Sequence, residues 1–225
     1  GTSGDLQSRE ENGTDIPPSQ TEAPEEAGTD EPLQTTGDAE LPAFQKTATI
    51  TETVLVDECD VRITATELGY NDYSAELALT IENNSEKDLS FTSNTVGYGC
   101  NSVNGYMVED GYLNCDVAAG KKANDTISIS YDTLMLYGIF EIADIEIGFN
   151  ISDSDYNRIY SGVGQVKTSA SDSYAYDLPS YRESIVSEAA QNTYHYAVPY
   201  FSDEVLHDQD GFAVVSSGLM INRDG

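Results

Sequence analysis

The sequence predicts a mainly β protein whose body is an antiparallel β-sandwich. Short runs of alternating apolar and polar residues follow one another between residues 49 and 166. Turn-forming residues separate these runs at intervals of roughly ten residues, a spacing typical of two packed antiparallel sheets. Strands do not alternate with helices, so a parallel sheet is not expected.

About eight strands are predicted in order, a normal number for one sandwich. They are Thr49–Val56, Val61–Ala65, Ala75–Ile81, Leu89–Val96, Ser102–Val108, Thr126–Tyr131, Ile142–Ile151 and Ile159–Val166. One segment breaks the pattern: Thr133–Ile139 suits a single helical turn, because Leu134, Met135 and Leu136 come just before Gly138. The Asn104-Gly105 and Asp110-Gly111 pairs predict tight turns, since glycine readily adopts the positive φ that such turns need.

Residues 1–46 differ in composition from everything after them. They hold five of the seven prolines and eleven acidic residues, against two basic residues, and Phe44 is their one aromatic residue. Such a segment cannot bury enough apolar surface to offset its loss of entropy on ordering. We expect a disordered acidic linker here, of the kind that remains after a signal peptide is cleaved and that holds a domain away from a surface.

After the predicted sandwich (residues 47–168), residues 169–225 predict a linker, a short helix at Ser180–Asn192 and further strands. Lys46–Leu68 and Ala197–Leu219 align without gaps at an offset of 151 residues, with apolar positions and an aspartate turn in register. We interpret residues 197–225 as resembling the start of a second sandwich. A lone hairpin is marginally stable in water and its free edge invites pairing, so self-association through these strands is a further expectation.

The net charge of −30, from 10 basic and 40 acidic residues, excludes several classes of function. A nucleic-acid binder needs a basic surface to neutralise phosphates, and this chain cannot supply one. No run approaches eighteen apolar residues, so no membrane-spanning segment is expected. The acidity fits either a solvated surface on a secreted protein or an acidic patch for a basic partner or calcium.

Four segments together resemble an immunoglobulin-like domain of uncharacterised extracellular lipoproteins from gut-dwelling Gram-positive bacteria. They are Asn83–Ser85, Ser102–Val108, Ala118–Ala123 and Ile142–Ile147, and the resemblance covers roughly residues 50–168. It implies an immunoglobulin-like β-sandwich that is extracellular and anchored at the bacterial cell surface, touching the membrane only through a lost N-terminal anchor. It implies no reaction, because the family has no assigned activity.

The cysteines leave two alternatives open. Cys100 and Cys115 flank the predicted hairpin, so they form either a disulfide, which an exported protein permits, or two buried thiols. The third cysteine, Cys59, lies among Asp57, Glu58 and Asp60, which disfavour a reactive thiolate.

No catalytic set, cofactor site or metal site is expected. His195 and His207 both fall outside the main sandwich, and no nucleophile elbow motif is present. Several carboxylate groups could offer oxygens to calcium, but none has the twelve-residue loop with its terminal glutamate. They are Asp57, Glu58 and Asp60; Asp153 and Asp155; and Asp208 and Asp210.

Tyrosine is the one residue type in unusual supply, with 15 copies in the chain. Tyr98, Tyr106 and Tyr112 gather around the predicted hairpin, where they are candidates to face a sugar or a protein. Tyrosine also fills half-buried strands well, which is the simpler explanation. The sequence thus predicts a non-catalytic cell-surface binding, adhesion or spacer module whose partner is a protein or a glycan. The alternative is a carbohydrate-binding module that uses exposed tyrosines, with or without calcium.

Overall fold

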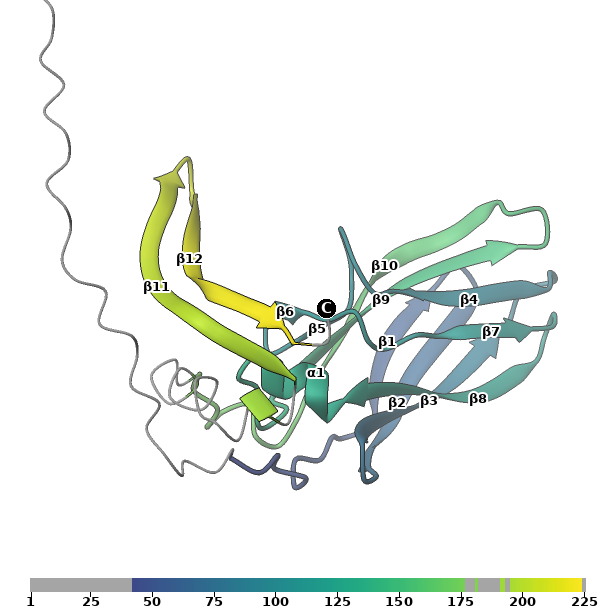
Figure 1. Cartoon of the computed structure of the whole chain (residues 1–225). Helices are drawn as coiled ribbons and strands as arrows, with labels where there is room; N and C mark the ends of the chain where they lie inside the picture. Colours follow the sequence, from purple (N-terminus) through teal and green to yellow (C-terminus); the bar gives the residue numbers. More distant parts are fainter. Residues whose placement is uncertain (1–41, 177–180, 182–190, 193–194, 224–225) are drawn as a thin grey trace, which may run out of the picture. The chain divides into compact units, whose positions relative to one another are not determined.

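The computed structural model describes residues 42–176, 181, 191–192 and 195–223. It confirms a mainly β protein with a β-sandwich, formed by two antiparallel sheets that face each other (Figure 1). The first sheet has the order β1-β2-β3-β8. Its strands are β1 (Thr53–Glu58), β2 (Val61–Tyr70), β3 (Ser74–Asn83) and β8 (Lys122–Ser130).

The second sheet has six strands arranged around β9. β10 pairs with one edge of β9 along its whole length, while β4 and β5 share the other edge end to end. β7 continues the sheet beyond β4, and β6 pairs with β5. The strands are β4 (Leu89–Asn94), β5 (Ser102–Val103), β6 (Tyr106–Met107), β7 (Asn114–Val117), β9 (Asp144–Asp153) and β10 (Arg158–Lys167).

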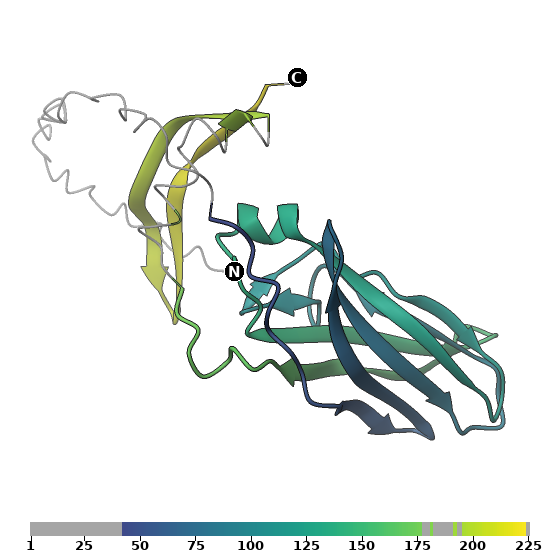
Figure 2. The same ribbon diagram turned by 90° about the horizontal axis from the view of Figure 1, so that it is seen from below.

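The core lies between the two sheets, as Figure 2 shows from a second direction. Alternate residues of each central strand point inward and are at most 1% exposed. On β3 they are Ala75, Leu77, Leu79 and Ile81, and on β9 they are Ile145, Ile147, Phe149 and Ile151. Each large apolar side chain buried in this way stabilises the fold by about 1.5–3 kcal/mol relative to exposure. The period-two alternation predicted from the sequence is therefore what assembles the sandwich.

Three elements differ from the sequence prediction. The expected strand Ser102–Val108 is a hairpin, because Asn104 and Gly105 both take positive φ and reverse the chain between β5 and β6. β7 was not predicted, because only four residues form it. The helical turn α1 spans Tyr131–Leu136, earlier than expected, because the hydroxyl of Ser130 accepts from Asp132 N and caps its start.

The sandwich also recruits residues that precede the predicted boundary at residue 47. Phe44 packs against the core, with its ring centroid 4.5 Å from that of Tyr131. The ammonium of Lys46 lies 4.6 Å from the centroid of the same ring. Of the predicted acidic linker, residues 1–41 lie outside the described residues. The predicted helix Ser180–Asn192 also lies outside them, apart from Tyr181, Gln191 and Asn192.

The C-terminal hairpin consists of β11 (Tyr196–Gln209) and β12 (Phe212–Asn222). It repeats the geometry of the β1–β2 hairpin at the offset of 151 residues. Glu58 pairs with Val61, as Gln209 does with Phe212, and the remaining β1–β2 pairs recur in the same register. The two-residue turns correspond as well: Cys59 and Asp60 have positive φ, and so do Asp210 and Gly211.

One irregularity also falls at the same place in the two hairpins. The register of β1–β2 shifts between Val54 and Val56, and one of the three shifts in β11–β12 lies between Val205 and His207. A bulge is a local feature that bends its strand at that point. Turn, register and bulge thus match between the two hairpins, and the second sandwich itself stays a prediction.

Candidate functional site

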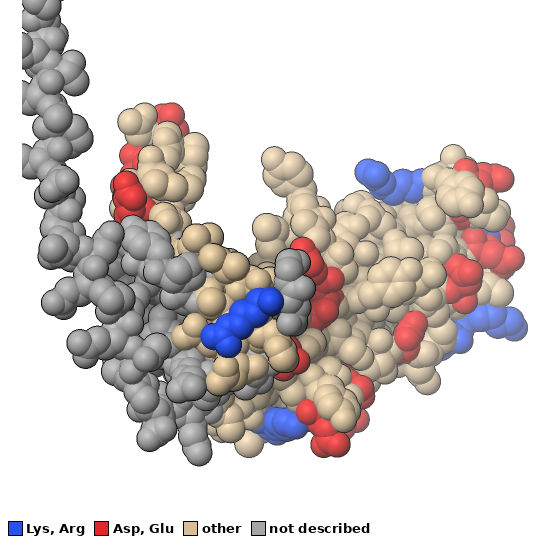
Figure 3. Space-filling model, viewed as in Figure 1, with Lys and Arg blue, Asp and Glu red and all other residues tan. Residues whose placement is uncertain are grey.

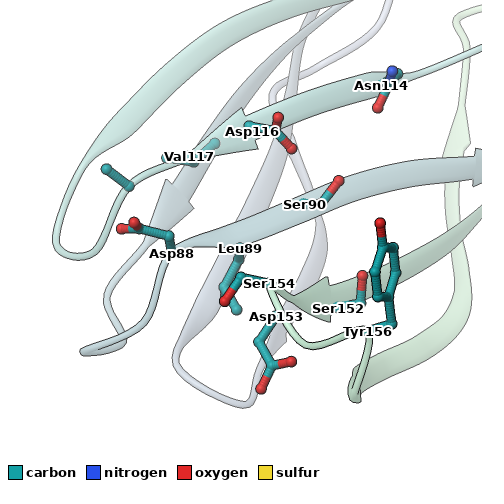
Figure 4. A pocket seen from close by; sticks show the side chains of 11 residues that line it. Asp88, Leu89, Ser90, Asn114, Asp116, Val117, Ser152, Asp153, Ser154 and Tyr156 are labelled. Atoms are coloured by element: carbon teal, nitrogen blue, oxygen red, sulfur yellow. The ribbon is translucent and has the colours of Figure 1, made fainter.

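The candidate site is an open groove of about 590 Å³ over the outer face of the second sheet. It is lined by strand residues of β4, β7 and β9, by the end of the turn before β4 and by the turns that follow β7 and β9. The lining residues are Asp88, Leu89, Ser90, Asn114, Asp116, Val117, Ala118, Ser152, Asp153, Ser154 and Tyr156 (Figure 4). Hydroxyl, amide and carboxylate groups dominate this set, whose ordered polar groups can both donate and accept hydrogen bonds.

Strand register places the floor of the groove in a row. Asp116 of β7 is paired with Ser90 of β4, and Ser90 is paired with Ser152 of β9. All three side chains point outward, because the residues on either side of Ser90, Leu89 and Phe91, are buried in the core. Figure 4 shows Ser90 lying between β7 and the Ser152 side of the groove. The row therefore presents a carboxylate and two hydroxyls on a rigid surface.

The rim near β7 is fixed by Asp88. Its carboxylate accepts a hydrogen bond of 2.9 Å from Ala119 N, in the turn between β7 and β8. That turn closes with Lys121 N donating to the carbonyl of Ala118, and Gly120 supplies the positive φ it requires. A fixed carboxylate here suits a ligand hydroxyl or cation and disfavours an anion.

The opposite rim is the β9–β10 turn, which Asp153 organises. Its Oδ1 accepts from the backbone N atoms of Asp155 and Asn157 at 3.1 and 3.0 Å. Its Oδ2 accepts from Lys87 Nζ at 2.8 Å, and the side chain is only 4% exposed. The hydrogen bond from Lys87 is the main cause that lowers the pKa of Asp153 to about 2, and the bonds from Asn157 and Asp155 add to it.

This turn holds Tyr156 in an unusual position. Tyr156 has φ of 62°, a conformation that a residue with a side chain adopts at a cost of about 1–2 kcal/mol. Its side chain is 91% exposed, so packing does not explain the strain. The bonds of Asp153 keep the turn closed, and Figure 4 shows the ring standing beside Ser152. The positive φ closes the turn, as at Asp60 and Asp210, and leaves the ring exposed beside the groove.

The ionisation of Asp153 predicts an acid-sensitive turn. Because its pKa is about 2 in the folded protein against 3.8 for the free group, its contribution is complete above pH 3.8 and is lost as the pH falls toward 2. We expect Asp153→Asn to lower the melting temperature at pH 7 by several degrees. Between pH 4 and 2, the melting temperature of the wild type should fall more steeply than that of this variant.

Asp155→Asn is the matched control, because Asp155 is an exposed carboxylate in the same turn. Asp155→Asn should follow the pH profile of the wild type, so that only Asp153→Asn departs from it. Circular dichroism melts across this pH range measure the melting temperatures of all three proteins. Parallel pH profiles for the wild type and Asp153→Asn would contradict the role given to Asp153.

Acidic side chains gather on the sandwich end that holds the β7–β8 and β9–β10 turns, on the face shown in Figure 3. Lysine and arginine side chains lie among them, in keeping with the Lys87–Asp153 pair and with a bond of 2.9 Å between Lys122 and Glu82. A groove in this setting repels anionic ligands, since the carboxylates of Asp88 and Asp116 lie at its edge and floor.

The tyrosines that the sequence singled out do not form one surface. Tyr98 is fully exposed and Tyr112 is 69% exposed, whereas Tyr106 is only 38% exposed. Tyr106 packs instead with Tyr176, at 5.3 Å between ring centroids, and with Tyr137. Burial raises the pKa of Tyr176, and it raises that of Tyr181 to about 12, so both stay protonated. This cluster joins the segment after β10 to α1 and the β5–β6 hairpin.

All three cysteines are free thiols in the structure, which holds Cys100 and Cys115 half-buried and not as a disulfide. Cys115 is paired with Phe91 on β4, while Asn101 N, next to Cys100, bonds to the carbonyl of Asn94. Asn94 lies three residues beyond Phe91, about 10 Å along the strand, and a disulfide needs Cα atoms within about 7 Å. Burial raises the pKa of Cys115, which disfavours its thiolate.

The carboxylates weighed as calcium ligands are engaged elsewhere or dispersed. Asp57 pairs with Arg62 at 3.1 Å, and Asp153 with Lys87. Among the described residues, no group of three or more His, Cys, Asp or Glu side chains is placed to hold a metal ion. His195 lies in the loop before β11, and His207 stacks on Phe212 with centroids 4.7 Å apart. Nor does any helix in the described part of the chain have the length and apolarity needed to cross a bilayer.

Sequence reasoning missed Tyr156 and the Asp116-Ser90-Ser152 row. The row depends on strand pairing, which a single sequence does not reveal. Tyr156 did leave a signal, because it is the one aromatic residue in a turn otherwise made of Asp, Ser and Asn (residues 153–157). An aromatic residue in such a turn gains no strand or core packing.

Comparisons with known proteins identify neither a family nor a function for this chain. No family model matches the sequence, and no curated protein matches it. One similar solved structure is that of chicken MD-1 complexed with lipid IVa. Its sequence is 14% identical, the match covers 53% of this chain and 99% of that one, and the TM-score is 0.24. A likeness this weak carries no inference about a ligand.

Proposed function

We propose that this chain is a non-catalytic binding module of the bacterial cell surface, and that its groove binds the hydroxyl groups of a glycan. The groove over β4, β7 and β9 carries this proposal, because it offers a row of fixed polar groups beside an exposed aromatic ring. Sugars are recognised in this way: an aromatic ring packs on the apolar face of the sugar, and polar side chains bond its hydroxyls.

The charge of the groove narrows the ligand class. Asp88 and Asp116 are acceptors for hydroxyl donors and repel phosphate or uronic acid groups. A neutral or amino-sugar glycan therefore fits better than an acidic polymer. The cell-surface location rests on the resemblance to extracellular lipoproteins and on the acidic character of residues 1–41. Calcium is not needed for this mode of binding.

The test is a titration with neutral and amino-sugar oligosaccharides, in which binding is followed by the amide chemical shifts of the labelled protein. A ligand should move the signals of Ser90, Asp116 and Ser152. Tyr156→Ala should weaken the affinity by about tenfold, which corresponds to 1.4 kcal/mol, because the ring is removed while the turn bonds of Asp153 remain.

Tyr73→Ala is the matched control. Tyr73 is also strongly exposed, at 81%, and it lies in the β2–β3 turn of the other sheet, away from the groove. Its loss should leave the affinity unchanged. If no glycan of the panel moves these signals, the proposed function is wrong. An equal loss of affinity in both variants would place the binding site elsewhere.

A protein partner is the second candidate, favoured by exposed apolar and aromatic side chains in the loop after β4, on β6 and in the loop before β7. Val96 is 63% exposed and Met107 57%, and Tyr98 and Tyr112 are exposed as well. Exposed aromatic and methionine side chains are typical of protein contacts. Tyr98→Ala should weaken binding to such a partner and leave glycan affinity unchanged, so one variant separates the two candidates.

A further inference from the structure

The C-terminal hairpin exposes the positions that the first hairpin buries. In β1 and β2, Leu55, Val61, Ile63 and Leu68 are between 0 and 8% exposed. At the offset of 151 residues their counterparts are Leu206, Phe212, Val214 and Leu219, which are 61, 58, 47 and 52% exposed. Corresponding positions are thus apolar in both hairpins, buried in the first and exposed in the second.

In the first hairpin, the outer edge of the second strand pairs with one more strand. On the side away from β1, β2 is paired antiparallel with β3 along nine residue pairs, from Val61↔Asn83 to Tyr70↔Ala75. In the part of the chain that the structure describes, β12 pairs only with β11, so the equivalent edge has no strand. An edge with this register and apolar character is a template for one more antiparallel strand.

The charge distribution selects the partner. β12, with the sequence FAVVSSGLMIN, carries no charged residue, in a chain whose net charge is −30. Edge strands are normally protected from pairing by charged side chains, and β12 lacks this protection. A second copy of the chain repels the first almost everywhere else, because both are strongly acidic. At β12 two copies can meet without bringing carboxylates face to face.

We propose that β12 is a self-association edge, and that two copies of the chain pair antiparallel along β12 about a two-fold axis near Ser217. Two identical antiparallel strands always satisfy such an axis. In this register Val215 of one copy lies opposite Leu219 of the other, and Ala213 lies opposite Ile221. The four strands then form one sheet, β11-β12-β12-β11, which is more stable than a lone hairpin.

This pairing has a characteristic salt dependence. The apolar strands attract, whereas the two net charges of −30 repel each other. Raising the NaCl concentration from about 0.1 M to about 1 M shortens the Debye length from about 10 Å to about 3 Å and removes most of this repulsion. The dimer should therefore strengthen with salt, the opposite of a contact with a basic partner.

Sedimentation equilibrium of the full chain tests the proposal, with the dimer dissociation constant as the readout. Val215→Lys should raise this constant by about tenfold or more, because each copy brings a charge to the apolar pair. Val163→Lys is the matched control: Val163 is also a strand valine, 43% exposed on β10, and its change should leave the constant unaltered. Melts of both variants confirm that the sandwich is intact.

A compensating variant tests the register itself. V215K/L219E places a lysine of each copy opposite a glutamate of the other, so dimerisation should return, now weakened by salt instead of strengthened. A chain that stays monomeric at high salt would overturn the proposal. A dimer insensitive to Val215→Lys, or a double variant that stays monomeric, would overturn pairing along β12.

Discussion

Replacing Asn83 by alanine is expected to destabilise the sandwich by about 3 kcal/mol, because one fully buried side chain joins three backbone groups. Its Nδ2 donates to the carbonyls of Lys87 and Val117 at 2.7 and 2.8 Å, and its Oδ1 accepts from Ser85 N at 3.0 Å. The residue is 0% exposed, so water cannot take over these bonds without opening the structure.

For a chain of this size the melting temperature should fall by about 6–12 °C, as measured by calorimetry. Asn84→Ala is the matched control, since the neighbouring asparagine is exposed and its backbone N keeps its bond to the carbonyl of Asp60. Asn83→Asp separates hydrogen bonding from packing. It preserves the shape but turns an acceptor toward two carbonyl oxygens, so it should destabilise at least as much as Asn83→Ala.

Asn83 also links stability to the candidate site. Its bonds connect the turn between β3 and β4 with the end of β7, and Asp88 and Val117 of these segments line the groove. Asn83→Ala should therefore weaken glycan binding as well, even below its melting temperature. If Asn83→Ala keeps the wild-type stability and affinity, these buried hydrogen bonds make no net contribution to either quantity.

The sequence predicted the sandwich well because the alternation of apolar and polar residues follows directly from which side chains are buried. Ala75, Leu77, Leu79 and Ile81 alternate with polar residues, and each of the four is at most 1% exposed. The same reasoning ended this strand at Ile81, whereas β3 runs on to Asn83. It missed that Asn83 points inward, because asparagine favours turns as a residue type whichever way its side chain points.

The candidate site was less predictable, because it depends on contacts between strands. Tyr98, Tyr106 and Tyr112 are neighbours in sequence, yet Tyr106 joins the Tyr137 and Tyr176 cluster and the other two stay exposed. Cys100 and Cys115 flank a turn as expected, but the loop of residues 95–101 interrupts the strand and offsets them. Loop geometry of this kind leaves no periodic signal in the sequence.

The repeat at an offset of 151 residues shows the opposite case, in which a weak sequence signal proves informative. Few residues are identical, yet the aligned pairs Asp57↔Arg62 and Asp208↔Ala213 occupy the same position in their hairpins. Backbone register is preserved because apolar spacing and turn length fix it, whatever the individual side chains. A pattern of apolar positions therefore carried structural information that residue identity did not.

Gly148→Ala is expected to be among the most damaging single-methyl additions in the sandwich, because a Cβ on Gly148 would overlap the carbonyl oxygen of Gly99. The loop of residues 95–101 lies directly over this point of β9. Backbone atoms cannot move aside as the end of a flexible side chain can, so the loop itself must shift. That shift would also break the 3.1 Å bond from Gly148 N to Asn101 Oδ1.

Asn101 adds to the loss of stability in Gly148→Ala. It is fully buried, and its Nδ2 donates to the carbonyls of Asp110 and Gly111 at 3.0 and 2.8 Å. Displacing Asn101 leaves these groups without their partner, so we expect a loss of stability of about 3 kcal/mol or more, again about 6–12 °C in melting temperature.

Gly69→Ala is the matched control. Its Cβ would meet only the carbonyl oxygen of Glu76, at 3.8 Å, so this strand glycine should accept alanine with no loss, or with a slight gain from reduced entropy of the unfolded chain. Equal melting temperatures for the two variants would mean that the 95–101 loop does not rest on β9.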